Sequence, residues 1–257
     1  KDVFESFWRK VTRRTLLSSV INTEELIVRW LEVYRGKAPW LSYDCVGLKG
    51  GKNSRTRRSL KMAKYICREI ASFVWSESPK IGEEDGTLNE WLEHQNFFNR
   101  AQKFTEYGAE AGGFAMKLRA PESGGLVLDF VPADYFIPVS WNNEGIYDAD
   151  FISRYVKDKK TFVAVESHKR LSPTQYEVTL VEYEEAGNEL KNKRDVSKTV
   201  INTTVPLFAY VPTPDVNNFD IDSPTGVSIF ANALDTLYSL DVAFDALGQE
   251  IILGKRR

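Results

Sequence analysis

The chain has 257 residues, which is long enough for one large or two small folded domains with a sizeable core. Its 34 Lys and Arg nearly balance its 36 Asp and Glu, and its 42% hydrophobic and 12% aromatic residues exclude an intrinsically disordered chain. Two cysteines and two histidines are too few for a disulfide scaffold or a closed zinc site, so we expect a reducing compartment and no metal or other cofactor.

Two helices are predicted in the first part of the chain. Residues 2–14 place apolar side chains at helical spacing, opposite a basic face. Asn22 is a candidate N-cap for a second helix. That helix is expected to end at Tyr34, because Gly36 and Pro39 follow it.

Two more helices are predicted before the chain changes its pattern. The third begins near Ser59 and carries an apolar stripe opposite several lysines and arginines. The fourth runs without interruption from Leu88 to Ala111, because its apolar residues keep helical spacing throughout. Gly112 and Gly113 are expected to end it.

The middle of the chain switches to strand patterns. Residues 114–118 and 126–131 flank a Pro-Glu-Ser-Gly-Gly turn, which predicts a β-hairpin. A run of helices followed by a meander of antiparallel strands favours an α+β fold. The further predicted strands are 135–139, 147–156, 162–168, 176–183 and 199–204.

A long helix is predicted at the end of the chain. Ser223 is a good N-cap and Pro224 a good first helical residue. The apolar spacing from Val227 to Ile251 then gives a helix of about 24 to 28 residues, well above the average length. We expect this helix to pack on other copies or on further sequence, and the alternative is that it folds back on the sheet.

The near-neutral total charge conceals two segments of opposite sign. Residues 1–68 hold sixteen Lys and Arg against six Asp and Glu, and residues 49–68 contain no acid. Residues 215–250 hold seven acids and no Lys or Arg. Such segregation suggests charged partners, although a solvated loop and an ordinary acidic helix would give the same pattern.

The sequence carries no recognisable catalytic motif. His94 and His168 lack a nucleophile pattern around them, so each is interpreted as a surface histidine or one satisfied by a partner. The Gly51-Lys52 pair fails the P-loop pattern, because Val46 stands at the first glycine and Asn53 at the hydroxyl position. We therefore expect a structural protein and not an enzyme.

A specific pattern of residues runs from Asn217 to Gly226. Supporting segments occur along the whole chain, at residues 22–40, 62–72, 112–113, 129–141, 206–212 and 231–257. Together these segments resemble the portal proteins of tailed phages, in the branch of siphophages and prophages of Gram-positive bacteria, and the stretch from Asn217 to Gly226 is the most specific part of the resemblance.

The resemblance implies a subunit of a ring, typically of twelve copies, at one capsid vertex. Such a ring nucleates head assembly, docks the terminase, and passes double-stranded DNA through its central tunnel. It later holds head-completion proteins and the tail, and capsid and scaffold proteins are further partners. The implied location is the host cytoplasm during assembly and then the virion, with no membrane partner.

The family's division into parts implies two regions here. Residues 1–210 resemble the α+β wing, and residues 211–257 resemble a linker and the start of the stem helix. The rest of the stem, the clip, the tunnel loop and the crown have no counterpart in the 257 residues, so the chain resembles a C-terminally truncated portal protein, and ring assembly and motor docking by it are in doubt.

The charge pattern gains a meaning from this resemblance. Asp235, Asp241 and Asp245 are expected to face the tunnel or the adjacent stem helix, because an acidic wall does not grip phosphates. A basic contact patch could face the capsid, the packaged DNA or an acidic surface of a neighbouring subunit. Its residues are Lys52, Arg55, Arg57, Arg58 and Lys61.

Two other functions remain open from the residues alone. The plentiful acids, such as Asp220 and Asp222, would suit a metal-dependent enzyme that processes nucleic acid, if they converged in a pocket. The basic stretch 49–68 would suit a general DNA-binding module, although it lacks interleaved aromatic residues.

Overall fold

The computed structural model describes residues 18–46, 50–77, 86–121, 124–186 and 189–255, with side chains from Glu25 onward. Helices and antiparallel sheets make up the chain, so the α+β class is confirmed. The strands Ser42–Val46, Lys52–Thr56 and Phe208–Pro212 were not predicted. The predicted helix over residues 2–14 lies outside the described residues. The helices are α2 (Ser18–Tyr34), α3 (Met62–Val74), α4 (Thr87–His94), α5 (Phe97–Ala111) and α6 (Leu234–Gly254).

The strands form three antiparallel sheets. The largest is a meander in which β5 to β9 pair in chain order, and a second sheet has the order β10-β3-β4. The third is the hairpin of β1 and β2. Their bounds are β1 (Ser42–Val46), β2 (Lys52–Thr56), β3 (Gly113–Arg119), β4 (Val127–Pro132), β5 (Phe136–Asn142), β6 (Gly145–Lys157), β7 (Lys160–Ser172), β8 (Gln175–Ala186), β9 (Glu189–Asn202) and β10 (Phe208–Pro212).

The three-stranded sheet is the middle layer of the body. On one face Phe114 and Phe130 pack with Ala101 of α5. On the other face Ala115 packs with Phe136 of the five-stranded sheet. The side chains of the neighbouring residues Phe114 and Ala115 therefore lie on opposite faces of the sheet, because successive side chains of a strand alternate between its two faces.

A second core lies where α2, α3 and α5 meet. Trp30 of α2 is fully buried there, and Cys67 of α3 lies beside it in the same cluster. Val227 and Phe230, which precede α6, complete the cluster. The start of the last helix is therefore built into the core of the body.

Glycine permits a close crossing at the end of α5. Gly112 has φ +94°, and a Cβ added to it would lie 2.4 Å from the carbonyl oxygen of Gly226. Next to this crossing, the Ile229 amide donates to the carbonyl of Ala109 over 3.0 Å. The predicted stop at Gly112 is thus confirmed, and the glycine pair also positions the segment that leads into α6.

The helix boundaries differ from the prediction in three places. The single helix expected over Leu88–Ala111 is two helices, because Asn96 adopts a left-handed conformation with φ 51°. Asn22 lies inside α2, which already begins at Ser18, so the predicted cap is wrong. The third helix begins at Met62, after Lys61 with φ 53°.

The strand predictions hold best where the strands are half-buried. The hairpin of β3 and β4 and the meander of β5 to β8 are confirmed. The last predicted strand, 199–204, is far too short, because β9 starts at Glu189. Most of β9 is exposed on both faces, so it lacks the apolar alternation that marks a strand in sequence.

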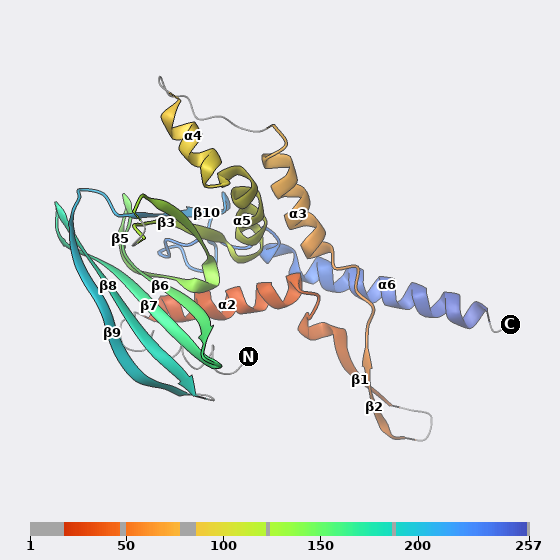
Figure 1. Ribbon diagram of the computed structural model, residues 1–257. Helices are drawn as coiled ribbons and strands as arrows, with labels where there is room; N and C mark the ends of the chain where they lie inside the picture. The colour runs from red at the N-terminus through yellow and green to blue at the C-terminus, as the bar shows by residue number, and fades with distance from the viewer. Residues whose placement is uncertain (1–17, 47–49, 78–85, 122–123, 187–188, 256–257) are drawn as a thin grey trace.

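The last helix also starts later than predicted. Ser223 and Pro224 do not begin it, because Ser223 Oγ bonds to the hydroxyl of Thr225 in a loop. A short 3-10 turn over Ala231–Ala233 precedes Leu234, and the helix has 21 residues. It does not fold back on a sheet but projects away from the body beside the β1–β2 hairpin (Figure 1).

Candidate functional site at the base of the last helix

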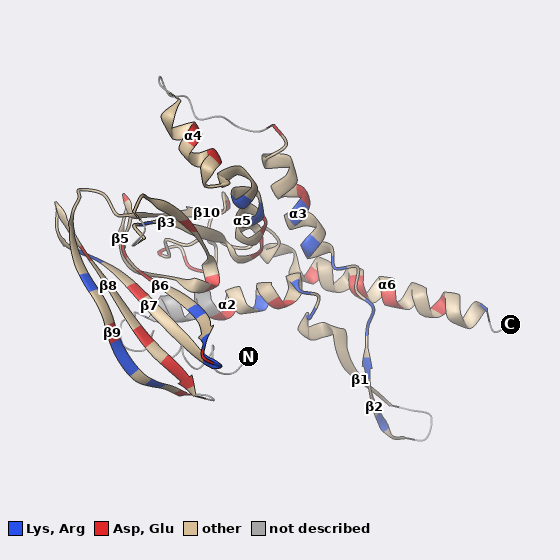
Figure 2. Ribbon diagram, viewed as in Figure 1, with Lys and Arg blue, Asp and Glu red and all other residues tan. Residues whose placement is uncertain are grey.

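Two buried aspartates lie on the face of α6 that meets the basic segment. Asp241 and Asp245 are 6% and 5% exposed and stand one helical turn apart. Figure 2 shows the acidic helix crossed by the segment that leads from β2 to α3. The two oppositely charged segments of the sequence are therefore neighbours within one chain.

The carboxylate of Asp241 joins two segments that precede α3. One oxygen accepts from the indole Nε1 of Trp40 over 3.0 Å, and the other accepts from the backbone amide of Leu60 over 3.1 Å. Trp40 and Leu60 are half-buried and Asp241 is buried, so loss of this acceptor would leave two partly shielded donors unpaired. Asp241 thus fixes α6 to the segment at the base of the hairpin.

Asp245 makes the next contact along the helix. It accepts from the backbone amide of Arg58 over 3.2 Å and from Nε2 of Gln249 over 2.6 Å. The guanidinium of Arg55 lies 3.9 Å away, with the Arg55 side chain 42% exposed. Because that partner is solvated, the ion pair contributes less than the amide bond does.

Arg57 fastens the same junction through aromatic rings. Its guanidinium lies 4.1 Å from the ring centre of Tyr43 and 5.9 Å from that of Tyr238. It also donates to the carbonyl oxygen of Trp40. This cation therefore binds within its own chain, across β1 and α6.

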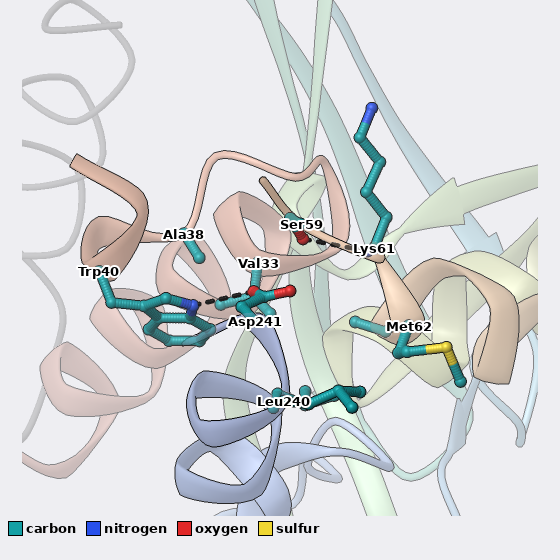
Figure 3. Close-up of a pocket in the computed structure, with 10 residues that line it drawn as sticks. Val33, Ala38, Trp40, Ser59, Lys61, Met62, Leu240 and Asp241 are labelled. Carbon is teal, nitrogen blue, oxygen red and sulfur yellow. Dashed lines mark hydrogen bonds between the residues drawn. The ribbon is translucent and has the colours of Figure 1, made fainter. Parts of the chain in front are cut away.

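A shallow pocket marks the centre of the junction (Figure 3). Its walls include Trp40, Met62 and Leu240, and its free volume of about 10 Å³ holds about one water molecule. The side chain of Lys61 points away from Asp241 in this view. The pocket is too small for a nucleotide or a sugar. The hydrogen bonds of the junction connect α6 to the segment that precedes α3.

The predicted site residues divide into two groups. The junction brings together Asp241, Asp245, Arg55, Arg57 and Arg58. Lys61 lines the pocket and is exposed, Asp235 is exposed near the start of α6, and Lys52 lies at the outer end of the hairpin. That any of the three aspartates faces a tunnel stays a prediction.

Sequence reasoning missed the partners of the aspartates. Trp40, Tyr43 and Tyr238 take part in the junction, and so does the backbone amide of Leu60. The available sign was the four-residue spacing of Asp241 and Asp245, which places both on one face of a helix.

A buried acidic cluster lies deeper in the body, between α2, α3 and α5. Burial raises the pKa of Glu110 to about 8, and the charge of Arg35 offsets part of that rise. Burial also raises the pKa of the Cys67 thiol. Nearby, the Tyr34 hydroxyl donates to Glu106 over 2.5 Å. Burial thus favours the protonated forms of Glu110 and Cys67.

A second polar cluster links the two larger sheets. Glu166 of β7 lies 2.5 Å from Nζ of Lys117 and 2.8 Å from Nε2 of His168. Burial would raise the pKa of Glu166, but these two partners outweigh it and lower the pKa to about 2. His94 is exposed, as predicted. His168 is buried, and its Nε2 pairs with Glu166 while its buried Nδ1 has no hydrogen-bond partner among the residues that the structure describes, so the predicted satisfaction by a partner holds for one ring nitrogen only.

Within the part of the chain that the structure describes, no three His, Cys, Asp or Glu side chains come close enough together to hold a metal ion. None of its helices is long and apolar enough to cross a membrane.

Comparison with known proteins identifies a family. The family model for phage portal proteins of the SPP1 Gp6-like type matches residues 1–251, which is nearly the whole chain. No curated protein matches the chain.

Proposed function

The chain belongs to the SPP1 Gp6-like family of phage portal proteins, and from this premise we propose that it forms part of a closed ring through which DNA enters and leaves the capsid. Its role in the phage particle is structural. The observation that carries the proposal is the family match over residues 1–251. The last helix projects from the body, so its exposed side chains can contact neighbouring copies in a ring.

We assign residues 1–210 to a wing-like unit and residues 211–257 to the linker and the start of a stem. The support is that α6 leaves the body while its first turns are anchored by Val227 and Phe230 in the core. Its outer half exposes Leu247, Ile251 and Leu253, at 60%, 53% and 54%. Apolar side chains displayed in this way fit burial against neighbouring copies.

The aspartates of α6 then have separate roles in the proposal. Asp241 and Asp245 hold the helix at a fixed angle to the wing, since both accept hydrogen bonds from it. Asp235 is exposed and available to the passage. From Asp235 to Gly254 the helix has no Lys or Arg, so it offers DNA phosphates no cation that would slow sliding.

The partners follow from the ring. It presents one repeated surface to the terminase during packaging and to head-completion proteins afterwards, with capsid and scaffold proteins around its rim. ATP hydrolysis belongs to the terminase in this scheme. The subunit would act in the host cytoplasm during assembly and remain in the virion.

Electron microscopy of the purified chain tests this proposal. We expect closed rings with a central opening in rotational averages, from this chain or from a version of it extended past Arg257. The variant Asp245→Ala should give fewer or irregular rings, because α6 loses its hold on the wing. The control Glu250→Ala removes an exposed acid from the same helix and should leave the rings unchanged. Particles that never close into rings would contradict the proposal.

A further inference from the structure

Within the part of the chain that the structure describes, most side chains of the β1–β2 hairpin are exposed, and its base contacts α6. Every residue of β2 from Lys52 to Thr56 is exposed, and Val46 at the end of β1 is 77% exposed. The hairpin projects away from the body (Figure 1). Two-stranded hairpins are marginally stable in water on their own, so a surface of this kind suits a partner.

The outer end of the hairpin combines an apolar side chain with a cation. Val46 pairs directly with Lys52 in the antiparallel register, so both side chains stand on one face. Lys52 forms no ion pair among the residues that the structure describes. The end of the hairpin therefore offers a positive charge beside an exposed aliphatic group.

The segment 214–222 has the complementary character. Val216 and Ile221 are 80% and 85% exposed, and each stands next to an exposed acid, Asp215 and Asp222 respectively. Its shape is set from within, because the buried Asn217 donates to the carbonyl of Thr225 and accepts from two amides of the segment. The segment therefore presents exposed apolar and acidic side chains in a shape that its own hydrogen bonds fix.

The inner face of this segment anchors it to the body. Phe219 packs edge-on against Trp30 of α2, with ring centres 6.0 Å apart. The indole of Trp141 donates to the carbonyl oxygen of Asp222 over 2.9 Å. Because these groups hold the inner face, Val216 and Ile221 are left to the outside.

We infer that the β1–β2 hairpin of one copy docks on segment 214–222 of the next copy. The inference rests on the proposed ring and names the contact that would build it. Two different surfaces meet in this contact, so the interface is heterologous, which is the type that closes into rings. Lys52 would lie against Asp222 or Asp215, and Val46 against Ile221 or Val216.

A second copy fits the hairpin better than DNA does. A phosphate backbone offers no apolar group that could pack against the exposed Val46, whereas the side chain of Ile221 is such a group. Arg57 is engaged by Tyr43 and the Trp40 carbonyl, and Arg55 lies near Asp245, so two of the hairpin's cations already have partners in their own chain.

Cysteine cross-linking tests the contact in the assembled protein. Chains carrying Val46→Cys and chains carrying Ile221→Cys, both with Cys45→Ser, are mixed, assembled and mildly oxidised. We expect a disulfide between different chains, while the buried Cys67 stays free. The control pairs Val46→Cys with Phe73→Cys, which is 82% exposed on α3 and should give no such product.

Charge reversal gives a second reading of the same contact. Lys52→Glu should weaken assembly at least about threefold, and adding Asp222→Lys should restore part of the loss. The control Lys157→Glu reverses an exposed charge at the end of β6 and should have no effect. The readout is the fraction of assembled protein against concentration, at low salt.

The outcomes separate the inference from the proposed function. Rings that form without the 46–221 disulfide leave the portal role standing and overturn the hairpin contact. A chain that never self-associates overturns both. If Lys52→Glu weakens binding of duplex DNA but leaves assembly unchanged, the hairpin binds nucleic acid and the inference is wrong.

Discussion

Asp241 and Glu250 lie on the same helix and are both acids, yet only Asp241 takes part in the junction between α6 and the segment that precedes α3. Asp241 is 6% exposed and accepts two hydrogen bonds from another segment, whereas Glu250 is exposed. A buried acceptor that serves two donors is costly to remove, because both donors are then left unpaired. At the scale of the residue, burial and partners decide the role of an acid.

This difference gives a direct stability prediction. Asp241→Ala should lower the free energy of unfolding by about 2 to 4 kcal/mol, because Trp40 Nε1 and the Leu60 amide lose their acceptor. Glu250→Ala should change it by no more than about 0.5 kcal/mol. Urea unfolding at pH 7 measures both. Equal losses in the two variants would show that the junction contributes nothing to stability.

The Glu166 cluster predicts a specific pH dependence. The pKa of Glu166 is lowered from 4.5 to about 2 in the folded chain, so its contribution is present above pH 4.5 and is lost as the pH falls towards 2. The contribution is about 3 kcal/mol at most. Glu166→Gln should lack this loss, and parallel stability curves for both chains between pH 4.5 and 2 would refute the assignment.

Residue chemistry was only partly predictable from the sequence. The two charge runs of opposite sign were visible in the sequence, and so was the exposed position of His94. The pairing of Asp241 with Trp40 and Leu60 was not, because it joins residues 201 and 181 positions apart. Contacts at such separations depend on how the elements pack, which local spacing does not encode.

At the scale of the element, single backbone positions set where helices stop. Asn96 divides the expected helix into α4 and α5, although the apolar spacing runs through it. Asparagine tolerates the left-handed conformation, but its presence in a helical pattern does not by itself predict a break. Gly112 was visible as a stop, since glycine is the usual residue there. Its close approach to Gly226 was not visible.

Gly112 therefore supplies a prediction with a matched control. Gly112→Ala should cost at least about 3 kcal/mol, because a Cβ would meet the carbonyl of Gly226 in addition to the strained φ. Gly86→Ala also sits at positive φ, yet its Cβ would meet open space, so it should cost only about 1 kcal/mol. Thermal unfolding compares the two, and equal costs would mean that the crossing relaxes freely.

At the scale of the whole molecule, the chain separates a packed body from two projections. The body holds the cores and the sheets, while α6 and the hairpin extend from it and are fastened to each other by Asp241, Asp245 and the segment 57–60. The α+β class and the family were both predictable, since they depend on patterns spread along the chain. The direction of α6 required the structure.

The mass of the assembled chain in solution tests the portal account most directly. Native mass spectrometry or light scattering over a range of concentrations compares this chain with a version extended past Arg257. At least one of the two should give one dominant species, a fixed multiple of its subunit mass and typically twelve copies. That mass should not grow as the concentration rises, because a closed ring has no free interface. If both chains stay at the mass of one subunit (29.3 kDa for this chain), or if either gives a ladder that lengthens with concentration, the account is contradicted.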